Sequence, residues 1–453
     1  MSRLLAVIAI VVVLTTSQVS AQYSFDFCGG GARAEGMGKA YLAVSDEITG
    51  ISWNPAGIYT IEKPVFGLSW GSLLPQGSSN VAYLPTVTHY DHSGSFNAIG
   101  SLCFAAPVRI KGHPFVGGVN YTRNFDVFRS LYSEGSIWQI YVPNENDPYD
   151  CDTSLTHVAL KWQRDGGVNS INIGFGTRLY DKLSLGAAIN IYTGRSLAFD
   201  DTHIVIEDSR YDPIAMQRGT LRIDSTVVDT NKFSGANFTV GFKFNGEKLA
   251  AALVVKTPFK LKVKYDRLVY SIHIFNGLPL DSETDTVYYM DNLIKCDMPW
   301  MVASGFALRL RENWLLAADA EFRAFKGGKI NIRDDITINP SGENLETYIE
   351  YDPRWNNVFT VRVGSEYLKS TKFGTIPIRL GIGYQPVPEP NYDSVGKASK
   401  ANGYLAALGS GIHWEQIHLD IAYSVSTIDV QYYGLYDYTN RNGHWNISFT
   451  GVF

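Results

Sequence analysis

The chain has 453 residues, a formal net charge of -5 and only 18% charged residues. This balance excludes the strongly basic surface that nucleic-acid binding requires, so we expect no nucleic-acid partner. Glycine, tyrosine and phenylalanine are abundant, whereas blocks of the helix-favouring residues alanine, leucine, glutamate and lysine are scarce. Such a composition is typical of a protein made of strands and turns.

Residues 1–21 have the pattern of a signal peptide. Arg3 precedes an apolar run that ends at Leu14, and the segment closes on a small residue, Ala21, before Gln22. The run is too short to cross a bilayer as a helix, and we expect no helical membrane anchor later in the chain. We therefore expect an exported protein that, if it resides in a membrane, must be a closed β-barrel.

From residue 64 onward the sequence divides into segments of about ten to thirteen residues in which apolar and polar residues alternate, as in tilted membrane strands. In the last segment, 444–453, every second residue from Trp445 to Phe449 is apolar and the residues between them are polar. We predict fourteen strands: 64–74, 95–106, 113–124, 168–179, 182–194, 233–244, 247–258, 298–310, 313–325, 356–368, 373–386, 402–413, 416–427 and 443–453. The connections are alternately long and short, which is the outer-membrane pattern of long outer loops and short periplasmic turns.

Alternation alone is equally compatible with a soluble antiparallel sandwich, but the placement of charge favours a membrane barrel. Several charged residues share the small or polar face of their strands, opposite an apolar face: Asp319, Glu321, Arg323, Arg362, Glu366 and Arg379. An apolar outside and a polar inside suit a barrel in lipid. Residues 260–266 also alternate, with lysines at 260, 262 and 264 opposite apolar residues.

Residues 31–57 carry a motif ahead of the first strand. Its residues are Gly31, Arg33, Ala34, Gly36, Met37, Gly38, Ala40, Asp46, Asn54, Pro55, Ala56 and Gly57. This motif resembles the N-terminal plug, or hatch, of the FadL/TodX family of outer-membrane transporters for hydrophobic compounds. Weaker similarity extends along the mature chain, at 104–107, 256–265, 298–300 and 380–390.

The resemblance implies an all-β fold, a 14-stranded antiparallel transmembrane β-barrel with an N-terminal luminal hatch. The expected divisions are a signal peptide at 1–21, the hatch at 22–63 and the barrel at 64–453. A barrel of this width leaks unless its lumen is filled. The hatch then either blocks the pore permanently or moves to let a solute pass.

The implied function is passive uptake of a hydrophobic compound, such as a long-chain fatty acid, across the cell outer membrane. Candidate capture residues in the outer loops are Phe125, Phe128, Tyr132 and Trp138. Lys260 or Arg379 is the candidate partner for a fatty-acid carboxylate. Because glycine inside a strand often marks a kink, Gly117 and Gly118 are either a lateral gate, as in the family, or positions of plain packing against the hatch.

The chain ends on Phe453, which resembles the C-terminal signal read by the outer-membrane assembly machinery. The expected partners are therefore this machinery, outer-membrane lipid and the hydrophobic solute. The main alternative function is that of the PorV-like carriers of type IX secretion, which have a similar hatch. A barrel enzyme acting on lipid is a third reading.

No motif favours catalysis or a cofactor. No Ser/His/acid set stands out, so we expect the inward carboxylates to pair with arginines, and we expect no enzyme. His89, Asp91 and His92 lack a further ligand, so we expect no metal site. Cys151 and Cys296 either form a disulfide between two long loops or remain unpaired thiols.

Overall fold

The structure is a computed structural model of the chain. It describes residues 29–81, 92–93, 96–126, 129–141, 152–209, 219–279, 285–336, 345–393, 395–432 and 436–453. The expected signal peptide and the residues His89, Asp91, Phe128 and Cys151 lie outside these ranges. None of the helices in the described ranges has the length and apolar character needed to cross a membrane.

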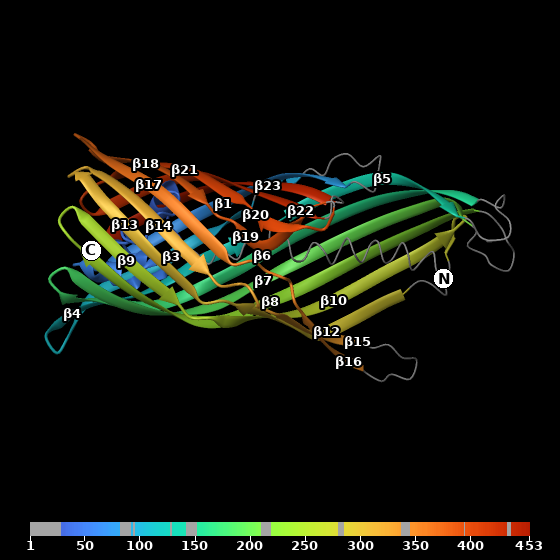
Figure 1. Cartoon of the computed structure of the whole chain (residues 1–453), viewed down its shortest axis with the longest axis horizontal. Coiled ribbons are helices and arrows are strands. Elements are labelled where there is room, and N and C mark those ends of the chain that lie inside the picture. Colours follow the sequence, from blue (N-terminus) through green and yellow to red (C-terminus); the bar gives the residue numbers. More distant parts are fainter. Residues whose placement is uncertain are drawn as a thin grey trace.

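A single antiparallel sheet closes on itself to form a 14-stranded barrel (Figure 1). Each strand pairs with the next around the ring, and the last strand pairs with the first from Val65↔Val452 to Val81↔Tyr436. The fourteen strands are β1 (Val65–Val81), β3 (Phe96–Ile110), β4 (His113–Asp126), β6 (Asp152–Tyr180), β7 (Leu183–Ser209), β8 (Gly219–Asn245), β9 (Leu249–Lys256), β13 (Met301–Arg311), β14 (Trp314–Arg323), β17 (Val358–Thr371), β18 (Gly374–Tyr384), β21 (Gly403–His413), β22 (Ile417–Tyr432) and β23 (Tyr436–Val452). The predicted fold class is confirmed.

Further strands lie in the long connections, where loops were expected. They are β2 (His92–Ser93), β5 (Arg129–Tyr141), β10 (Phe259–Phe275), β11 (Leu278–Pro279), β12 (Asp285–Met298), β15 (Ile330–Ile336), β16 (Leu345–Tyr351), β19 (Val387–Tyr392) and β20 (Ala398–Ala401). Their physical role follows from pairing. β8 pairs with β9 over residues 239–245 and with β10 over residues 221–234, so β10 satisfies the backbone of β8 beyond the end of β9.

The barrel wall has an uneven height. β6, β7 and β8 contain 29, 27 and 27 residues, whereas β14 and β18 contain 10 and 11. A membrane strand needs only about 9–11 residues. The long strands, with β5, β10 and β12 beside them, therefore continue as a curved wall past the rim formed by the shorter strands (Figure 1).

The two faces of the strands differ as expected for a barrel in lipid. On β18, Arg379 is 1% exposed, whereas its neighbours Ile378 and Leu380 are 46% and 62% exposed. The same holds for the other charged residues expected on the inner face, all of which are buried. Large apolar side chains cover the outer face instead, so the predicted orientation of the strands agrees with the structure.

Residues 29–64, called the N-terminal segment from here on, lie inside the barrel. They form α2 (Ala32–Gly36), α3 (Gly50–Trp53) and a 3-10 helix η1 (Pro55–Thr60). α2 contacts β18 and β21 to β23, while α3 and η1 contact β4, β6 and β7, so the segment touches opposite sides of the wall. Asn54 starts η1 because its side chain accepts a hydrogen bond from the Ala56 backbone, and Pro55 suits the first helical position.

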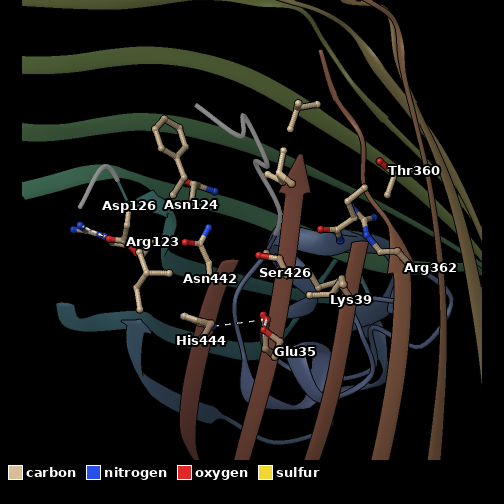
Figure 2. A pocket seen from close by; sticks show the side chains of 18 of the residues that line it. Glu35, Lys39, Arg123, Asn124, Asp126, Thr360, Arg362, Ser426, Asn442 and His444 are labelled. Atoms are coloured by element: carbon tan, nitrogen blue, oxygen red, sulfur yellow. Dashed lines mark hydrogen bonds and ion pairs between the residues drawn. The ribbon is translucent and has the colours of Figure 1, made fainter. Parts of the chain in front are cut away.

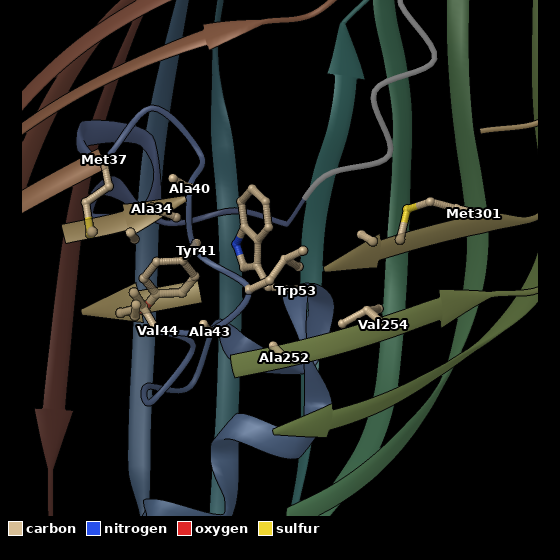
Figure 3. Packing of buried hydrophobic residues seen from close by; sticks show 14 residues of the cluster. Ala34, Met37, Ala40, Tyr41, Ala43, Val44, Trp53, Ala252, Val254 and Met301 are labelled. Atoms are coloured by element: carbon tan, nitrogen blue, oxygen red, sulfur yellow. The ribbon is translucent and has the colours of Figure 1, made fainter. Parts of the chain in front are cut away.

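An apolar cluster joins this segment to the wall (Figure 3). Met37, Tyr41 and Trp53 of the segment are buried, and the Tyr41 and Trp53 rings meet edge to face with centroids 5.9 Å apart. Small inward residues of β9 and β13, Ala252 and Ala303 among them, complete the cluster. Aromatic pairs of this kind stabilise by about 0.5–1.5 kcal/mol beyond the area that they bury.

The outward position of Leu380 gives a direct test of the barrel's orientation in lipid. Leu380→Arg is expected to destabilise the protein by about 2–4 kcal/mol, because it places a charge on the lipid face near the middle of β18. The measurement is urea unfolding in lipid vesicles. Phe373→Arg, in the turn before β18, is the matched control and should cost about 0–1 kcal/mol. Equal costs for the two variants would contradict the assigned orientation.

Candidate functional site: the buried charge network and the lumen cavities

The N-terminal segment approaches the wall closely at glycines. Gly38 has a φ of 62°, which side-chain-bearing residues rarely adopt. A Cβ atom at Gly38 would lie 2.8 Å from the Gly381 carbonyl carbon, and one at Gly381 would lie 2.1 Å from the Gly38 nitrogen. The two backbones therefore touch, and any side chain at either position would push the segment away from β18.

Arg33 joins the segment to the wall through a buried charge network. Its Nε and Nη2 atoms donate to the two carboxylate oxygens of Glu366, at 2.9 and 2.8 Å, and its Nη1 donates to Asp46 at 2.6 Å. Glu366 also accepts from Arg379 at 2.7 Å, and Arg379 donates to Asp420 at 2.5 Å. Because buried charges are costly unless paired, this chain of partners fixes the segment in place.

Wall side chains also bind the backbone of the segment. The Asp319 carboxylate accepts hydrogen bonds from the backbone nitrogens of Tyr41 and Leu42, at 2.6 and 2.9 Å. The Lys243 ammonium donates to the Val44 carbonyl at 2.6 Å. These bonds satisfy backbone groups that no helix or strand of the segment itself satisfies.

An open cavity lies above the segment, with about 1540 Å³ of empty space that includes its opening to solvent. Glu35 and Lys39 of the segment form its floor (Figure 2). Lys39 has a φ of 64°, in the region that glycine prefers, so its backbone adopts this position at a conformational cost. Much of the surrounding wall is polar, including Arg123, Asn124, Asp126, Thr360, Arg362, Ser424, Ser426, Asn442, His444 and Asn446.

Glu35 is an ionised group in this floor. It accepts a hydrogen bond from Ser424 and lies 3.7 Å from the imidazole of His444 (Figure 2). Burial, the largest influence, acts to raise its pKa, but Lys39, His444 and Ser424 together outweigh burial and lower the pKa to about 2. The carboxylate is therefore charged at any physiological pH.

A cluster of charges continues up the cavity wall. Glu321 pairs with Arg323 at 2.6 Å and with Arg362 at 3.1 Å, so two guanidinium groups share one carboxylate. Arg123 pairs with Asp126 at 2.5 Å. This side of the cavity can therefore hold a polar or anionic group by ion pairing and hydrogen bonding.

A second, smaller cavity beside the first is mainly apolar. It is lined by Tyr192, Asn237, Lys256, Phe259, Met298, Pro299, Met301, Arg323 and Phe325. The Tyr192 and Phe259 rings stack with centroids 4.7 Å apart. Arg323 and Phe325 line both cavities, so a charged surface and an aromatic surface meet at this point of the lumen.

The two candidates for a fatty-acid carboxylate partner are not supported by their positions. Arg379 does lie inside the barrel, but it belongs to the network that holds Arg33. Lys260 does not line the lumen. Its side chain is 59% exposed, on the outer face of β10, and pairs with Asp297 at 3.4 Å. The correction follows from the alternation of β10, in which Leu261 and Tyr265 face inward and are buried.

The proposed lateral gate at Gly117 and Gly118 is also not found. β4 pairs with both neighbours here, with Gly117 between Ala106 and Phe175 and Gly118 between Ala105 and Gly174. A Cβ atom on Gly118 would lie 2.6 Å from the Ile51 side chain, so this glycine permits packing against the N-terminal segment. The irregularity of β4 occurs instead between Arg123 and Phe125, at the cavity wall.

The other expected capture residues have mixed outcomes. Phe125 is 8% exposed and lines the larger cavity. Tyr132 and Trp138 lie in β5, but the structure describes only their backbone. Phe128 lies outside the described residues. Three lining residues, Lys39, Tyr192 and Phe325, were not predicted from the sequence, because no local pattern distinguishes them from ordinary core or turn residues.

The remaining chemical candidates give no site in the described residues. Cys103 and Cys296 are buried free thiols, which agrees with the alternative in which Cys296 is unpaired, while Cys151 lies outside the described residues. Burial raises the pKa of a thiol and makes it less reactive. No group of three potential metal ligands occurs within the described ranges.

Asp319 provides a test of how firmly the segment is held. Asp319→Ala should leave two buried N–H groups without an acceptor, at a cost of about 1–3 kcal/mol each, and so loosen the segment. Single-channel conductance in planar bilayers is then expected to rise, while Asp319→Asn, which keeps one acceptor oxygen, should show a smaller rise. An unchanged conductance in Asp319→Ala would show that this contact does not hold the segment.

Comparison with solved structures shows the same fold in hydrophobic-compound transporters. A Pseudomonas aeruginosa FadL homologue is 14% identical, with 95% of this chain and 100% of that chain covered and a TM-score of 0.57. The Pseudomonas putida toluene transporter TodX is 14% identical, with 95% and 99% covered and a TM-score of 0.57. The CymD monoaromatic hydrocarbon channel is 12% identical, with 95% and 99% covered and a TM-score of 0.56.

Sequence comparisons give one further result. No curated protein matches the chain. The family model described as BamG matches residues 144–372, just over half of the 453 residues. The chain therefore belongs to the BamG family.

Proposed function

We propose that the protein is an outer-membrane channel for passive uptake of a hydrophobic compound, with residues 22–63 acting as a hatch. The observation that carries the proposal is the pair of lumen cavities, one aromatic and one charged, that meet at Arg323 and Phe325 above the N-terminal segment. An apolar solute would occupy the larger cavity against the aromatic surface that begins at Phe325, and a polar end, such as a fatty-acid carboxylate, would meet Arg323.

The energetics support an uptake that needs no external energy source. Burial of apolar surface is favourable by about 25 cal/mol per Å2, so aromatic side chains such as Tyr192 and Phe259 can extract an apolar solute from water. The concentration gradient of the solute would then set the direction of transport. The solved structures with the same fold include a toluene transporter and a monoaromatic hydrocarbon channel, which favours this class of solute.

Passage of a solute past the N-terminal segment requires a local rearrangement in this proposal. Arg33, Tyr41 and Leu42 are bound to the wall by charged side chains, so displacement of the whole segment would break several buried bonds at once. A local change that leaves these anchors intact costs less. Lateral release at Gly117 and Gly118 is not part of the proposal, because β4 is paired on both sides there.

The two cavities allow the ligand class to be tested by substitution. The double variant Tyr192→Ala/Phe325→Ala should weaken binding of toluene and of palmitate about tenfold or more, because it removes two rings from the apolar surface. Arg323→Gln should weaken palmitate alone. Binding is measured by isothermal titration calorimetry in mild detergent.

Phe359→Ala, on the lipid face, is the matched control and should bind both ligands like the unmodified protein. Failure of the unmodified protein to bind either compound, together with the absence of any copurified lipid-like molecule by mass spectrometry, would refute a hydrophobic ligand.

A second candidate function is an association with the outer-membrane assembly machinery, favoured by the match to the BamG family. It predicts that the full-length protein, purified in mild detergent from its own membrane, retains the assembly machinery at a fixed ratio. Recovery without any such component would count against it, whatever the outcome of the ligand measurements.

A further inference from the structure

A dense group of basic residues lies on the outer face of the long strands that continue past the rim. It lies beyond the band of outward apolar side chains that surrounds the barrel, called the apolar belt from here on. We define the basic patch as Arg195 on β7, Lys232 on β8, Lys262 and Lys264 on β10, and Lys295 on β12. Arg195 lies directly opposite Lys232, Lys232 directly opposite Lys264, and Lys262 directly opposite Lys295. Four strands therefore place five cations on one continuous surface.

The side chains of the patch point away from the lumen. Their strand neighbours Tyr192, Phe233 and Leu261 are buried in the aromatic cluster that lines the lumen, and alternation turns the basic residues to the opposite face. Arg195, Lys232, Lys262 and Lys264 are exposed, and Lys295 is partly exposed. The patch is thus part of the outer surface of the wall.

The patch is not neutralised from within the described part of the chain. Two carboxylates lie nearby on the same face, Asp266 and Asp297, and Asp297 pairs with Lys260, which is not a member of the patch. No described carboxylate lies within salt-bridge distance of any of the five cations. Like charges directly opposite each other destabilise a sheet, so this arrangement is unfavourable unless an external anion is present.

The distance of the patch from the short turns, measured along β8, indicates that this anion belongs to the lipid headgroup region. On β8 the outward residues nearest the short-turn end are apolar, from Phe244 to Phe238. At about 2.5 Å of vertical rise per tilted residue, a belt about 25 Å tall starting at Phe244 ends near residue 234. Lys232 then lies just above the hydrocarbon region, at the depth of the lipid headgroups.

An exposed tryptophan supports this boundary. Trp300, between β12 and β13, is 44% exposed, as expected for a residue of the aromatic girdle at the edge of the apolar belt. Strand β10 begins at Phe259, which pairs with Met298, two residues from Trp300. The lysines of β10 therefore begin at the level where the apolar belt ends.

We propose that the basic patch binds the phosphate-bearing headgroup of a lipid in the outer leaflet, with the acyl chains of that lipid against the apolar belt below. Phosphate suits the patch because a phosphomonoester carries about -1.5 to -2 charges and several acceptor oxygens, enough to bridge opposed lysines. The proposal rests on the membrane location in the proposed function, but not on the uptake activity.

The test compares the unmodified protein with a patch variant, Lys232→Gln/Lys262→Gln/Lys264→Gln/Lys295→Gln. Native mass spectrometry in neutral detergent measures binding of three probes: diphosphorylated lipid A, the same lipid without its phosphates, and inorganic phosphate. We expect the unmodified protein to bind the phosphorylated lipid at least tenfold more tightly than the dephosphorylated lipid. The patch variant should lose this difference.

The matched control neutralises four lysines in or beside the short turns at the opposite end of the barrel, Lys111, Lys182, Lys248 and Lys372. This variant should bind the phosphorylated lipid like the unmodified protein. Thermal unfolding provides a second measurement. The phosphorylated lipid should raise the midpoint of the unmodified protein and of the control, but not of the patch variant.

Two results would overturn the proposal. Equal binding of the two lipids by the unmodified protein would show that phosphate is not recognised, and equal binding by the patch variant would place recognition elsewhere. If inorganic phosphate at the same concentration displaced the lipid completely, the site would be one for free phosphate. Ligand uptake is expected to be unchanged in the patch variant, so a failure here leaves the channel proposal standing.

Discussion

The structure depends on the satisfaction of backbone hydrogen bonds at every strand edge. In lipid no water is available to replace a missing partner, so the sheet is stable there only as a closed ring. The pairing of β1 with β23 closes that ring. The same requirement acts above the belt, where β10 takes the place of β9 beside β8 and so extends the wall.

Closure creates a lumen, and the charges inside it must find partners. The inward residues Asp319, Glu366 and Arg379 would be costly in a dry interior, and the N-terminal segment satisfies them with Arg33 and with backbone N–H groups. The segment in turn has little regular structure to satisfy its own backbone. Wall and segment therefore stabilise each other, which explains why polar residues gather on the inner faces of β14, β17 and β18.

The sequence predicts the barrel well because its determinants are local. Alternation along a strand, as in 444–453, depends only on neighbouring residues and on which face meets lipid. The short turns follow from the same pattern. The buried position of Arg379 was predicted for this reason, since its apolar neighbours fix the face on which it lies.

The candidate site is harder to predict because it depends on contacts between distant residues. Lys260 was assigned to the lumen because its segment alternates, but alternation cannot tell which face is inside when both faces meet water. Gly117 and Gly118 illustrate a second difficulty, since a glycine that permits packing and one that marks a kink look the same in sequence. Arg323, Tyr192 and Phe325 line one cavity because the folded barrel brings β7 and the end of β14 together, which no local pattern in the sequence reveals.

The uneven height of the wall affects how other molecules at the membrane surface can approach the entrance of the barrel. On one flank the long strands β6, β7 and β8 stand beyond the rim, and on the other flank the shorter strands leave the entrance low. Within the described residues, a neighbouring protein or a bulky glycan therefore meets a higher wall on one side of the entrance than on the other. The tall flank shields the entrance on its own side, so in the proposed uptake the orientation of the barrel among its neighbours affects the direction from which a solute approaches.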